Sequence, residues 1–169
     1  MKPQPNILIR RFKREDFEAI LGMTESCWRG ASFNQRIEEL FGLRGKPWWE
    51  LKRDSIKGFL ERHPDWVFVA EVDGKVVGYA TYSLDKTQRV GHVLNNAVHP
   101  DWRRKGIGRA LHRRVLEELE REGMEVALLV TAVHNVPARR IYESHGFEVV
   151  WEALYYAKRL KPSPNSSSR

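Results

Sequence analysis

A glycine-rich turn near the middle of the chain reads Arg103-Arg104-Lys105-Gly106-Ile107-Gly108-Arg109-Ala110. An apolar run at residues 93–98 predicts a strand before this turn, and an amphipathic segment ending near residue 122 predicts a helix after it. The first turn of a helix carries unpaired N–H donors and the positive end of the helix dipole. Glycines let a phosphate approach the backbone, and the basic side chains suit the same anion. We expect this turn to hold a pyrophosphate.

Two other phosphate-binding loops are excluded by the residues that follow. No Lys-Ser or Lys-Thr pair comes after Gly108, so the turn is not the P-loop of nucleoside triphosphatases. The dinucleotide fingerprint needs a third small residue where this chain has Leu111, and it belongs to the first strand–helix unit of a parallel sheet. The spacing Arg103-x-x-Gly106-x-Gly108 instead resembles the coenzyme A signature of the GNAT superfamily of N-acetyltransferases.

A second segment resembles the other signature of that superfamily, in which Asn, Ala, Tyr and Gly-Phe stand at fixed offsets. It reads Asn135-Val136-Pro137-Ala138-Arg139-Arg140-Ile141-Tyr142-Glu143-Ser144-His145-Gly146-Phe147. The pattern predicts a short helix, with Asn135 as its N-cap and Pro137 tolerated in the first turn. Gly146 is expected to take the left-handed conformation that ends the helix. From Asp65 to Arg159, the resemblance covers more than half of the chain.

The resemblance implies an α/β fold of the α+β type, with a single GNAT-like domain over residues 1–160 and a disordered tail over residues 161–169. Its centre is a twisted, mixed, mostly antiparallel sheet of about six to seven strands flanked by helices. The residue pattern predicts strands at 7–12, 66–72, 75–82, 90–98, 125–133, 147–151 and 154–160, and helices at 14–28, 34–41, 47–63, 107–122 and 135–145. Asp73-Gly74 is a strong two-residue hairpin signal.

Composition narrows the class of partner. The chain has 169 residues, a formal net charge of +7 and one cysteine, Cys27. The charge favours an anion such as coenzyme A, and a general nucleic-acid partner is not favoured. A single cysteine predicts a cytoplasmic protein, and no apolar run is long enough to cross a membrane. No His, Cys, Asp or Glu spacing predicts a metal site.

The resemblance further implies acetyl-CoA as the cosubstrate and transfer of its acetyl group to a primary amine, by direct attack in a ternary complex. In that family the fourth strand separates from the fifth, and the cofactor arm would pair with the backbone of Asn96, Ala97 and Val98. The Val98 amide is the candidate oxyanion donor. Asn135 either bonds the cofactor arm or only caps its helix. The residues expected to hold the cofactor are Asn96, Ala97, Val98, Arg103, Arg104, Lys105, Gly106, Ile107, Gly108, Arg109, Ala110, Asn135 and Tyr142.

Tyr142 matches the tyrosine that protonates the departing sulfur in this family, and a phenol with a pKa near 10 is a reasonable donor to a thiolate. The structural alternative is a tyrosine that only packs its helix onto the sheet. The general base is left open between His92, which occupies the position of a family glutamate, Glu71 and ordered water. An imidazole with a pKa near 6.5 can accept a proton at neutral pH.

The acceptor is either a small-molecule amine or a protein amine. Residues 128–133 lack the glutamate that many peptide N-terminal members carry, so a protein α-amine is less favoured. Aromatic residues expected around an acceptor pocket are Trp28, Phe33, Phe41, Trp48, Trp49, Tyr155 and Tyr156. The competing function is a non-catalytic acyl-CoA sensor or interaction module. The oligomeric state is left open, with a homodimer as one alternative because dimers are common in this fold.

Overall fold

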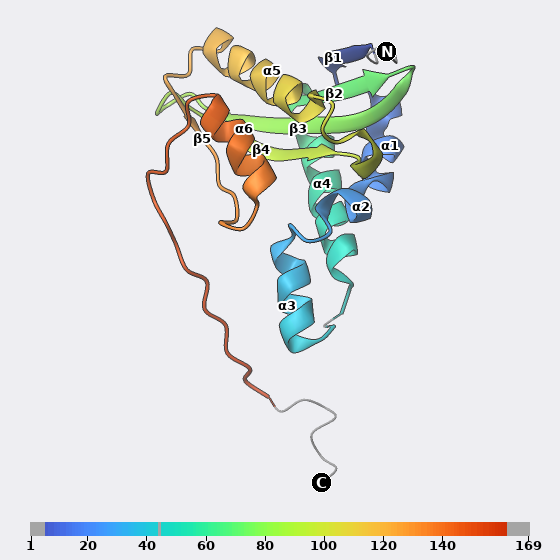
Figure 1. Ribbon diagram of the computed structural model, residues 1–169, viewed down its shortest axis with the longest axis vertical. Helices are drawn as coiled ribbons and strands as arrows, with labels where there is room; N and C mark the ends of the chain where they lie inside the picture. Colours follow the sequence, from blue (N-terminus) through green and yellow to red (C-terminus); the bar gives the residue numbers. More distant parts are fainter. Residues whose placement is uncertain (1–5, 44, 162–169) are drawn as a thin grey trace.

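The computed structural model describes residues 6–43 and 45–161, which form one five-stranded sheet with helices on both faces (Figure 1). Along the chain the elements are β1 (Ile7–Arg11), η1 (Arg14–Asp16), α1 (Phe17–Gly22), α2 (Thr24–Trp28), α3 (Phe33–Phe41), α4 (Trp48–Arg62), η2 (Pro64–Trp66), β2 (Val67–Val72), β3 (Lys75–Asp85), β4 (Val90–Val98), η3 (Pro100–Trp102), α5 (Ile107–Arg121), β5 (Val126–Leu128) and α6 (Val136–Ser144). The strand order is β1-β2-β3-β4-β5, and only the β4–β5 pair is parallel. The predicted mixed, mostly antiparallel architecture is confirmed.

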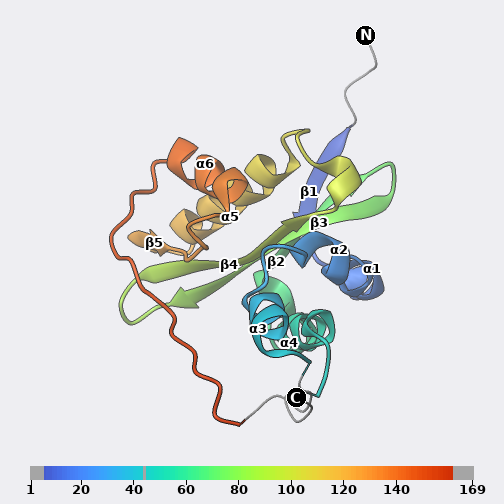
Figure 2. The same ribbon diagram turned by 60° about the horizontal axis from the view of Figure 1, so that its bottom comes forward.

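Two apolar layers hold the helices to the sheet. On one face, Phe68, Tyr82 and Val93 pack with the inner side of α5, and α6 lies against α5 (Figure 2). On the other face, Tyr79 packs with residues of α1, α2 and α4, including the fully buried Ile56. Burial of apolar area on both faces is the main stabilising contribution, at roughly 25 cal/mol for each Å².

The β2–β3 hairpin forms as predicted around Asp73-Gly74. Asp73 has φ 49° and Gly74 has φ 75°, and positive φ at both central residues is the requirement of a type I′ turn. That turn matches the right-handed twist of the flanking strands and sets the register next to it, where Val72 faces Lys75 and Glu71 faces Val76. The register then shifts between Glu71 and Ala70, because Ala70 faces Gly78.

A β-bulge interrupts the β3–β4 pair where Ala80 and Tyr82 of β3 face Asn96 and Val93 of β4. Val93 and Val98 both pack on the α5 side of the sheet. Residues five apart in a regular strand lie on opposite faces of the sheet. The bulge adds one residue to β4 between Val93 and Val98, and both side chains therefore lie on the same face. Thr81 stabilises the bulge, because its hydroxyl oxygen accepts a hydrogen bond from the Asn95 N–H at 2.9 Å.

Three expectations about the elements need correction. The predicted helix at 14–28 is divided into η1, α1 and α2, with a break at Met23. The strand expected at 125–133 is only the three residues of β5, and the described residues 147–160 form no strand. The sheet therefore has five strands among the residues described, not six or seven. The domain boundary at residue 160 stays a prediction, and residues 162–169 of the expected tail lie outside the described residues.

The segment after α6 leaves the sheet as an extended trace on the outside of the molecule (Figures 1 and 2), and two of its side chains contact α3. Tyr155 contacts Phe33 with ring centroids 4.8 Å apart, and the Arg159 guanidinium lies 5.4 Å from the centre of the Phe41 ring. Trp151 is 85% exposed. An alternating apolar pattern makes a strand only where a long enough edge is available, and β5 offers three residues of pairing.

We expect Gly78→Ala to destabilise the protein by about 1–3 kcal/mol, because an added Cβ would lie 2.9 Å from the Ala97 carbonyl oxygen. A backbone atom in a paired strand cannot turn aside as a side-chain tip can. The matched control is Gly22→Ala, where a Cβ would meet nothing within 4 Å. Urea unfolding of the two variants measures the difference, and equal midpoints would contradict the packing argument.

Candidate functional site

The glycine-rich turn joins the end of β4 to the start of α5, as predicted. Gly106 has φ 80° and occupies the N-cap position of α5, where no side chain caps the helix and the first turn holds no acid. A Cβ on Gly106 would meet nothing within 4 Å, so the space beside this backbone is open. Arg104 also takes a positive φ, of 60°. The turn therefore presents the first N–H groups of α5 to an anion, which fits a pyrophosphate.

The basic residues of the turn divide into two pairs. Arg103 donates from Nε to the Val98 carbonyl at 3.1 Å and from Nη2 to the Cys27 carbonyl at 3.1 Å, so it ties β4 to α2. Lys105 donates to the Asp101 carbonyl at 3.3 Å. Within residues 6–43 and 45–161, no side chain pairs with Arg104 or Arg109, and both are exposed. These two arginines are the better placed to meet phosphate oxygens.

Gly108 brings three elements together beside the turn. A Cβ at Gly108 would lie 3.3 Å from Ile141 Cδ1 of α6 and 3.7 Å from Val98 Cγ2 of β4. The small residue at this position lets α6 approach the start of α5 and the end of β4 closely. Tyr142 follows Ile141, so the predicted acid lies on an element that packs beside the predicted cofactor strand. Ile107 is buried and Ala110 is half-buried in the same turn of α5.

Beyond His92, no strand among the described residues pairs with one edge of β4. The parallel pairing with β5 covers only Val90 to His92, which face Val126 to Leu128. The His99 N–H donates to the Val77 carbonyl at 2.8 Å, so backbone groups at alternate residues, including Ala97, point toward β3. Asn96 and Val98 therefore point their N–H and C=O groups at the open edge, where the Val98 carbonyl already accepts Arg103. This alternation favours Asn96 and Val98 over Ala97 as backbone partners of an extended ligand.

Tyr142 is half-buried between α5 and residue Phe147. Burial raises the pKa of its phenol. Its ring lies 5.1 Å from that of His112, whose side chain is fully buried and contacts His145 through the two Nδ1 atoms at 3.2 Å. Burial, with His145 next to it, lowers the pKa of His112 to about 4, so this imidazole is neutral at pH 7. No motif in the sequence singled out His112, although it occupies the inner stripe of α5 beside Leu111.

The two side chains named as bases occupy different surroundings. His92 is half-buried at the last β4 position that pairs with β5, which is where the two strands separate. Glu71 accepts a hydrogen bond from Arg10 Nε at 2.7 Å, which engages its carboxylate in an ion pair at the far edge of the sheet. Asn135 is the N-cap of α6 by position, but its side chain makes no capping bond and donates to Thr131 Oγ1 at 3.4 Å.

Five of the seven aromatic residues expected around an acceptor lie on α2, α3 and α4, on the other face of the sheet, and Tyr155 and Tyr156 lie in the segment after α6. The Trp28 indole N–H donates to the buried Tyr79 hydroxyl at 3.0 Å, and Trp48 is 6% exposed. Lys52 of α4, which the sequence analysis did not single out, lies with its Nζ 3.7 Å from the centre of the Trp28 ring. Its neighbours Leu51 and Arg53 are exposed, so the sequence pattern of α4 gives no signal for its contacts.

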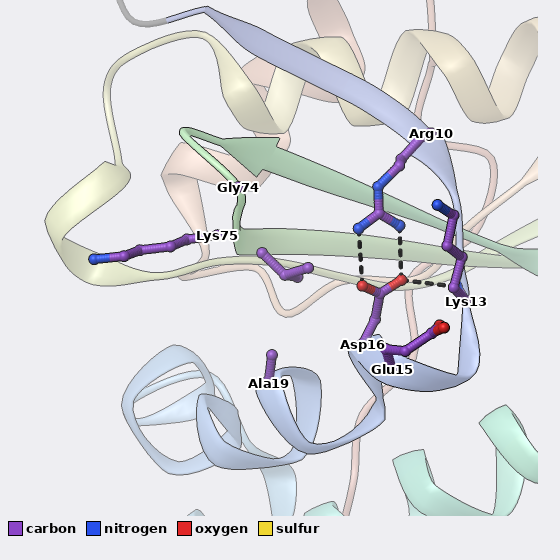
Figure 3. Close-up of a pocket in the computed structure, with 8 residues that line it drawn as sticks. Arg10, Lys13, Glu15, Asp16, Ala19, Gly74 and Lys75 are labelled. Carbon is purple, nitrogen blue, oxygen red and sulfur yellow. Dashed lines mark hydrogen bonds and ion pairs between the residues drawn. The ribbon is translucent and has the colours of Figure 1, made fainter.

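A hollow between β1, α1 and the β2–β3 turn is a separate feature (Figure 3). It is lined by Arg10, Lys13, Glu15, Asp16, Ala19, Gly74, Lys75 and Val76. Arg10 donates two hydrogen bonds to Asp16, at 2.7 and 2.8 Å, so these two side chains satisfy one another. Because Asp16 is the N-cap of α1, the pair connects the start of α1 to β1.

The described part of the chain contains no helix long and apolar enough to span a bilayer. Among residues 6–43 and 45–161, no group of three His, Cys, Asp or Glu side chains could hold a metal ion. Cys27 is buried, and burial raises the pKa of its thiol to about 11.

Comparisons with known proteins agree with this arrangement. The profile of the acetyltransferase (GNAT) family matches residues 26–147. An acetyltransferase of Pectobacterium atrosepticum is 31% identical over 152 residues, which are 90% of this chain and 94% of that protein. The crystal structure of a Pyrococcus horikoshii protein superimposes with a TM-score of 0.70 at 25% identity, covering 88% of this chain and 92% of the other. A Salmonella typhimurium structure, described as a candidate acetyltransferase with its cofactor acetyl-CoA, has a TM-score of 0.66 at 25% identity and covers 86% and 82%.

Proposed function

Because the chain belongs to the acetyltransferase (GNAT) family, whose enzymes use acetyl-CoA, we propose that it transfers the acetyl group to a primary amine by direct attack in a ternary complex. The observation that carries this proposal is the open edge of β4. The Asn96 backbone groups and the Val98 N–H face this edge, which leads into the glycine-rich turn and lies beside the helix that bears Tyr142. One continuous surface thus offers an extended edge, an anion site and an acid.

The residues of that surface fit coenzyme A in shape and charge. The pyrophosphate would be held by the free N–H groups that start α5 at Ile107, Gly108 and Arg109, with the Arg104 and Arg109 side chains around them. The open space at Gly106 accepts an oxygen close to the backbone. The pantetheine arm would extend along Asn96 and Val98, and its amides would supply the strand partner that β5 does not.

Stabilisation of the oxyanion and protonation of the departing sulfur then each have a group of this chain to serve them. The bound thioester supplies an activated acyl group. The Val98 N–H, on the open edge, stabilises the negative charge that develops on the acetyl oxygen. Tyr142 gives its proton to the departing sulfur, and its raised pKa keeps the phenol protonated at neutral pH. His112 packs against the Tyr142 ring and fixes its position.

The acceptor is proposed to be a primary amine of a small molecule or of a protein side chain, entering from the α2–α4 side of the sheet. Trp28 borders that side, and its ring contacts the Lys52 amine. A cytoplasmic location and a homodimer remain predictions.

The test is release of free thiol from acetyl-CoA in the presence of pooled polyamines, amino acids, aminoglycosides, and peptides with a lysine or a free N-terminus. Turnover with one pool supports the transferase and begins to define its acceptor. Calorimetry with acetyl-CoA alone is the companion measurement. Binding without turnover in any pool would favour an acyl-CoA sensor, and absence of binding would contradict the site itself.

A further inference from the structure

Lys52 extends from α4 to the bulged part of β4. Its Nζ donates to the Asn95 side-chain oxygen at 2.8 Å and lies 3.7 Å from the centre of the Trp28 ring. Asn95 is the residue whose backbone N–H is held by Thr81 in the bulge, and it precedes Asn96. The amine therefore lies on the face of β4 that α2 and α4 cover, from which the acceptor is proposed to enter. The acetyl donor is proposed to bind along the open edge of the same strand.

No carboxylate among the described residues forms an ion pair with this amine. The charged or titratable groups of the elements around it are Glu18 of α1, Glu25 and Cys27 of α2, Arg29 just after α2, Arg36, Glu38 and Glu39 of α3, Asp65 of η2, Tyr79 of β3, whose hydroxyl bonds Trp28, and His92 of β4. Several of them are engaged elsewhere: Glu25 pairs with Arg29, and Glu38 accepts the Trp48 backbone N–H at 2.7 Å. Lys46, just before α4, differs because Asp54 and Glu50 both contact it.

The surroundings of Lys52 bring the pH range in which its ammonium group loses a proton closer to neutral. Burial lowers the pKa of the Lys52 ammonium to about 8. Asn95 and Trp28 both stabilise the charged form, but neither replaces the water that the ammonium loses. A large fraction of Lys52 is consequently a free amine under mildly alkaline conditions, whereas an ordinary lysine with a pKa near 10.4 is almost fully protonated.

We propose that Lys52 is the general base of the acetyl transfer, receiving a proton from the acceptor's ammonium group; this inference rests on the proposed function. The neutral Nζ takes one proton, and the acceptor becomes a free amine. The amine lone pair forms the C–N bond as the C–S bond breaks, and the second proton reaches the sulfur through Tyr142. Lys52 then returns its proton to water, so charge and atoms balance. Lys52 in its charged form would repel an ammonium acceptor, so the same residue sets both binding and deprotonation.

The first experiment is a pH profile of kcat/KM with acetyl-CoA, using spermidine, kanamycin and a lysine-containing peptide as separate amine probes. For the wild-type enzyme we expect a limb that rises with pH, with a midpoint near the pKa of about 8. Lys52→Met should lower kcat/KM by about 10²-fold or more and remove that limb, with the acetyl-CoA affinity unchanged. Lys57→Met, at an exposed position on the same helix, is the matched control and should leave the profile intact.

The second experiment reads the Lys52 amine directly and does not depend on activity. In protein labelled with ¹³C at the lysine ε-carbons, the resonance that disappears in Lys52→Arg should titrate well below the others. A midpoint near 10, with the other lysines, would overturn the inference. So would a Lys52→Met enzyme that keeps the wild-type limb, or mass spectrometry showing that wild-type Lys52 itself becomes acetylated during turnover. If the wild type turns over none of the three amines, the proposed function fails as well; if it turns one over equally well without Lys52, only this inference fails.

Discussion

Tyr142→Phe is expected to lower kcat by about 10²-fold or more while leaving the Kd for acetyl-CoA within about twofold of the wild type. The substitution removes one hydroxyl and keeps the ring that packs against His112 and Phe147. A thiolate must then leave without a proton donor beside it, so the loss falls on the chemical step. Stopped-flow detection of the thiol, with calorimetry for the affinity, separates the two quantities.

The matched control for this variant is Ser144→Ala, which also removes one hydroxyl from α6, at an exposed position. It should behave as the wild type in both measurements. If Tyr142→Phe also retains full activity, the tyrosine only packs α6 against α5, and another group protonates the sulfur. If the protein binds acetyl-CoA but neither form turns over any amine, the binding-module reading gains support.

Glu118→Gln is expected to destabilise the protein by about 3 kcal/mol, because it leaves a cluster of arginines without its central carboxylate. Glu118 is 1% exposed and forms ion pairs with Arg11 of β1 and with Arg114 and Arg121 of α5. The carboxylate therefore joins the first strand of the sheet to the long helix. Guanidinium unfolding measures the loss, and Glu117→Gln, at an exposed position of α5, should change the stability by less than about 0.5 kcal/mol.

The same carboxylate predicts how stability depends on pH. Burial acts to raise the pKa of Glu118, but hydrogen bonds from Arg121 and Arg11 outweigh it and hold the pKa at about 2, against 4.5 for the free group. A pKa that is lower in the folded state stabilises the protein above pH 4.5, and the contribution is lost as pH falls toward 2. The wild type should therefore lose roughly 3 kcal/mol over this window, whereas Glu118→Gln should lack that part of the pH dependence. Parallel slopes for the two proteins would contradict the ion-pair argument.

The parts of the fold that local chemistry determines could be predicted from the sequence. Asp73-Gly74 specifies its hairpin because both residues accept positive φ, and Gly146 ends α6 with φ 83° for the same reason. The anion site at the glycine-rich turn could also be predicted. The first turn of α5 has no side-chain cap and no acidic residue, so its N–H groups can attract an anion without any tertiary contact. Such features depend on residues within a few positions of one another.

What could not be predicted depends on partners far apart in the sequence. Lys52 and Glu118 look like ordinary charged helix residues until Trp28 and Arg11 are placed beside them, although Glu118 does stand seven residues after the buried Leu111. Residues 147–160 alternate like strands, but a strand also needs an edge to pair with. The sequence pattern contains no information about the length of β5.

Because one edge of β4 is unpaired within the described part of the chain, neighbouring amide protons should exchange with solvent deuterium at different rates. Ala97 and His99 are bonded toward β3 and should exchange slowly, whereas the amides of Asn96 and Val98 open onto the free edge and should exchange quickly. Saturating acetyl-CoA should slow only the fast pair. Exchange at Asn96 and Val98 would then report binding of the ligand. Exchange at Ala97 and His99, measured in the same experiment, would report whether the sheet stays intact and would serve as an internal reference.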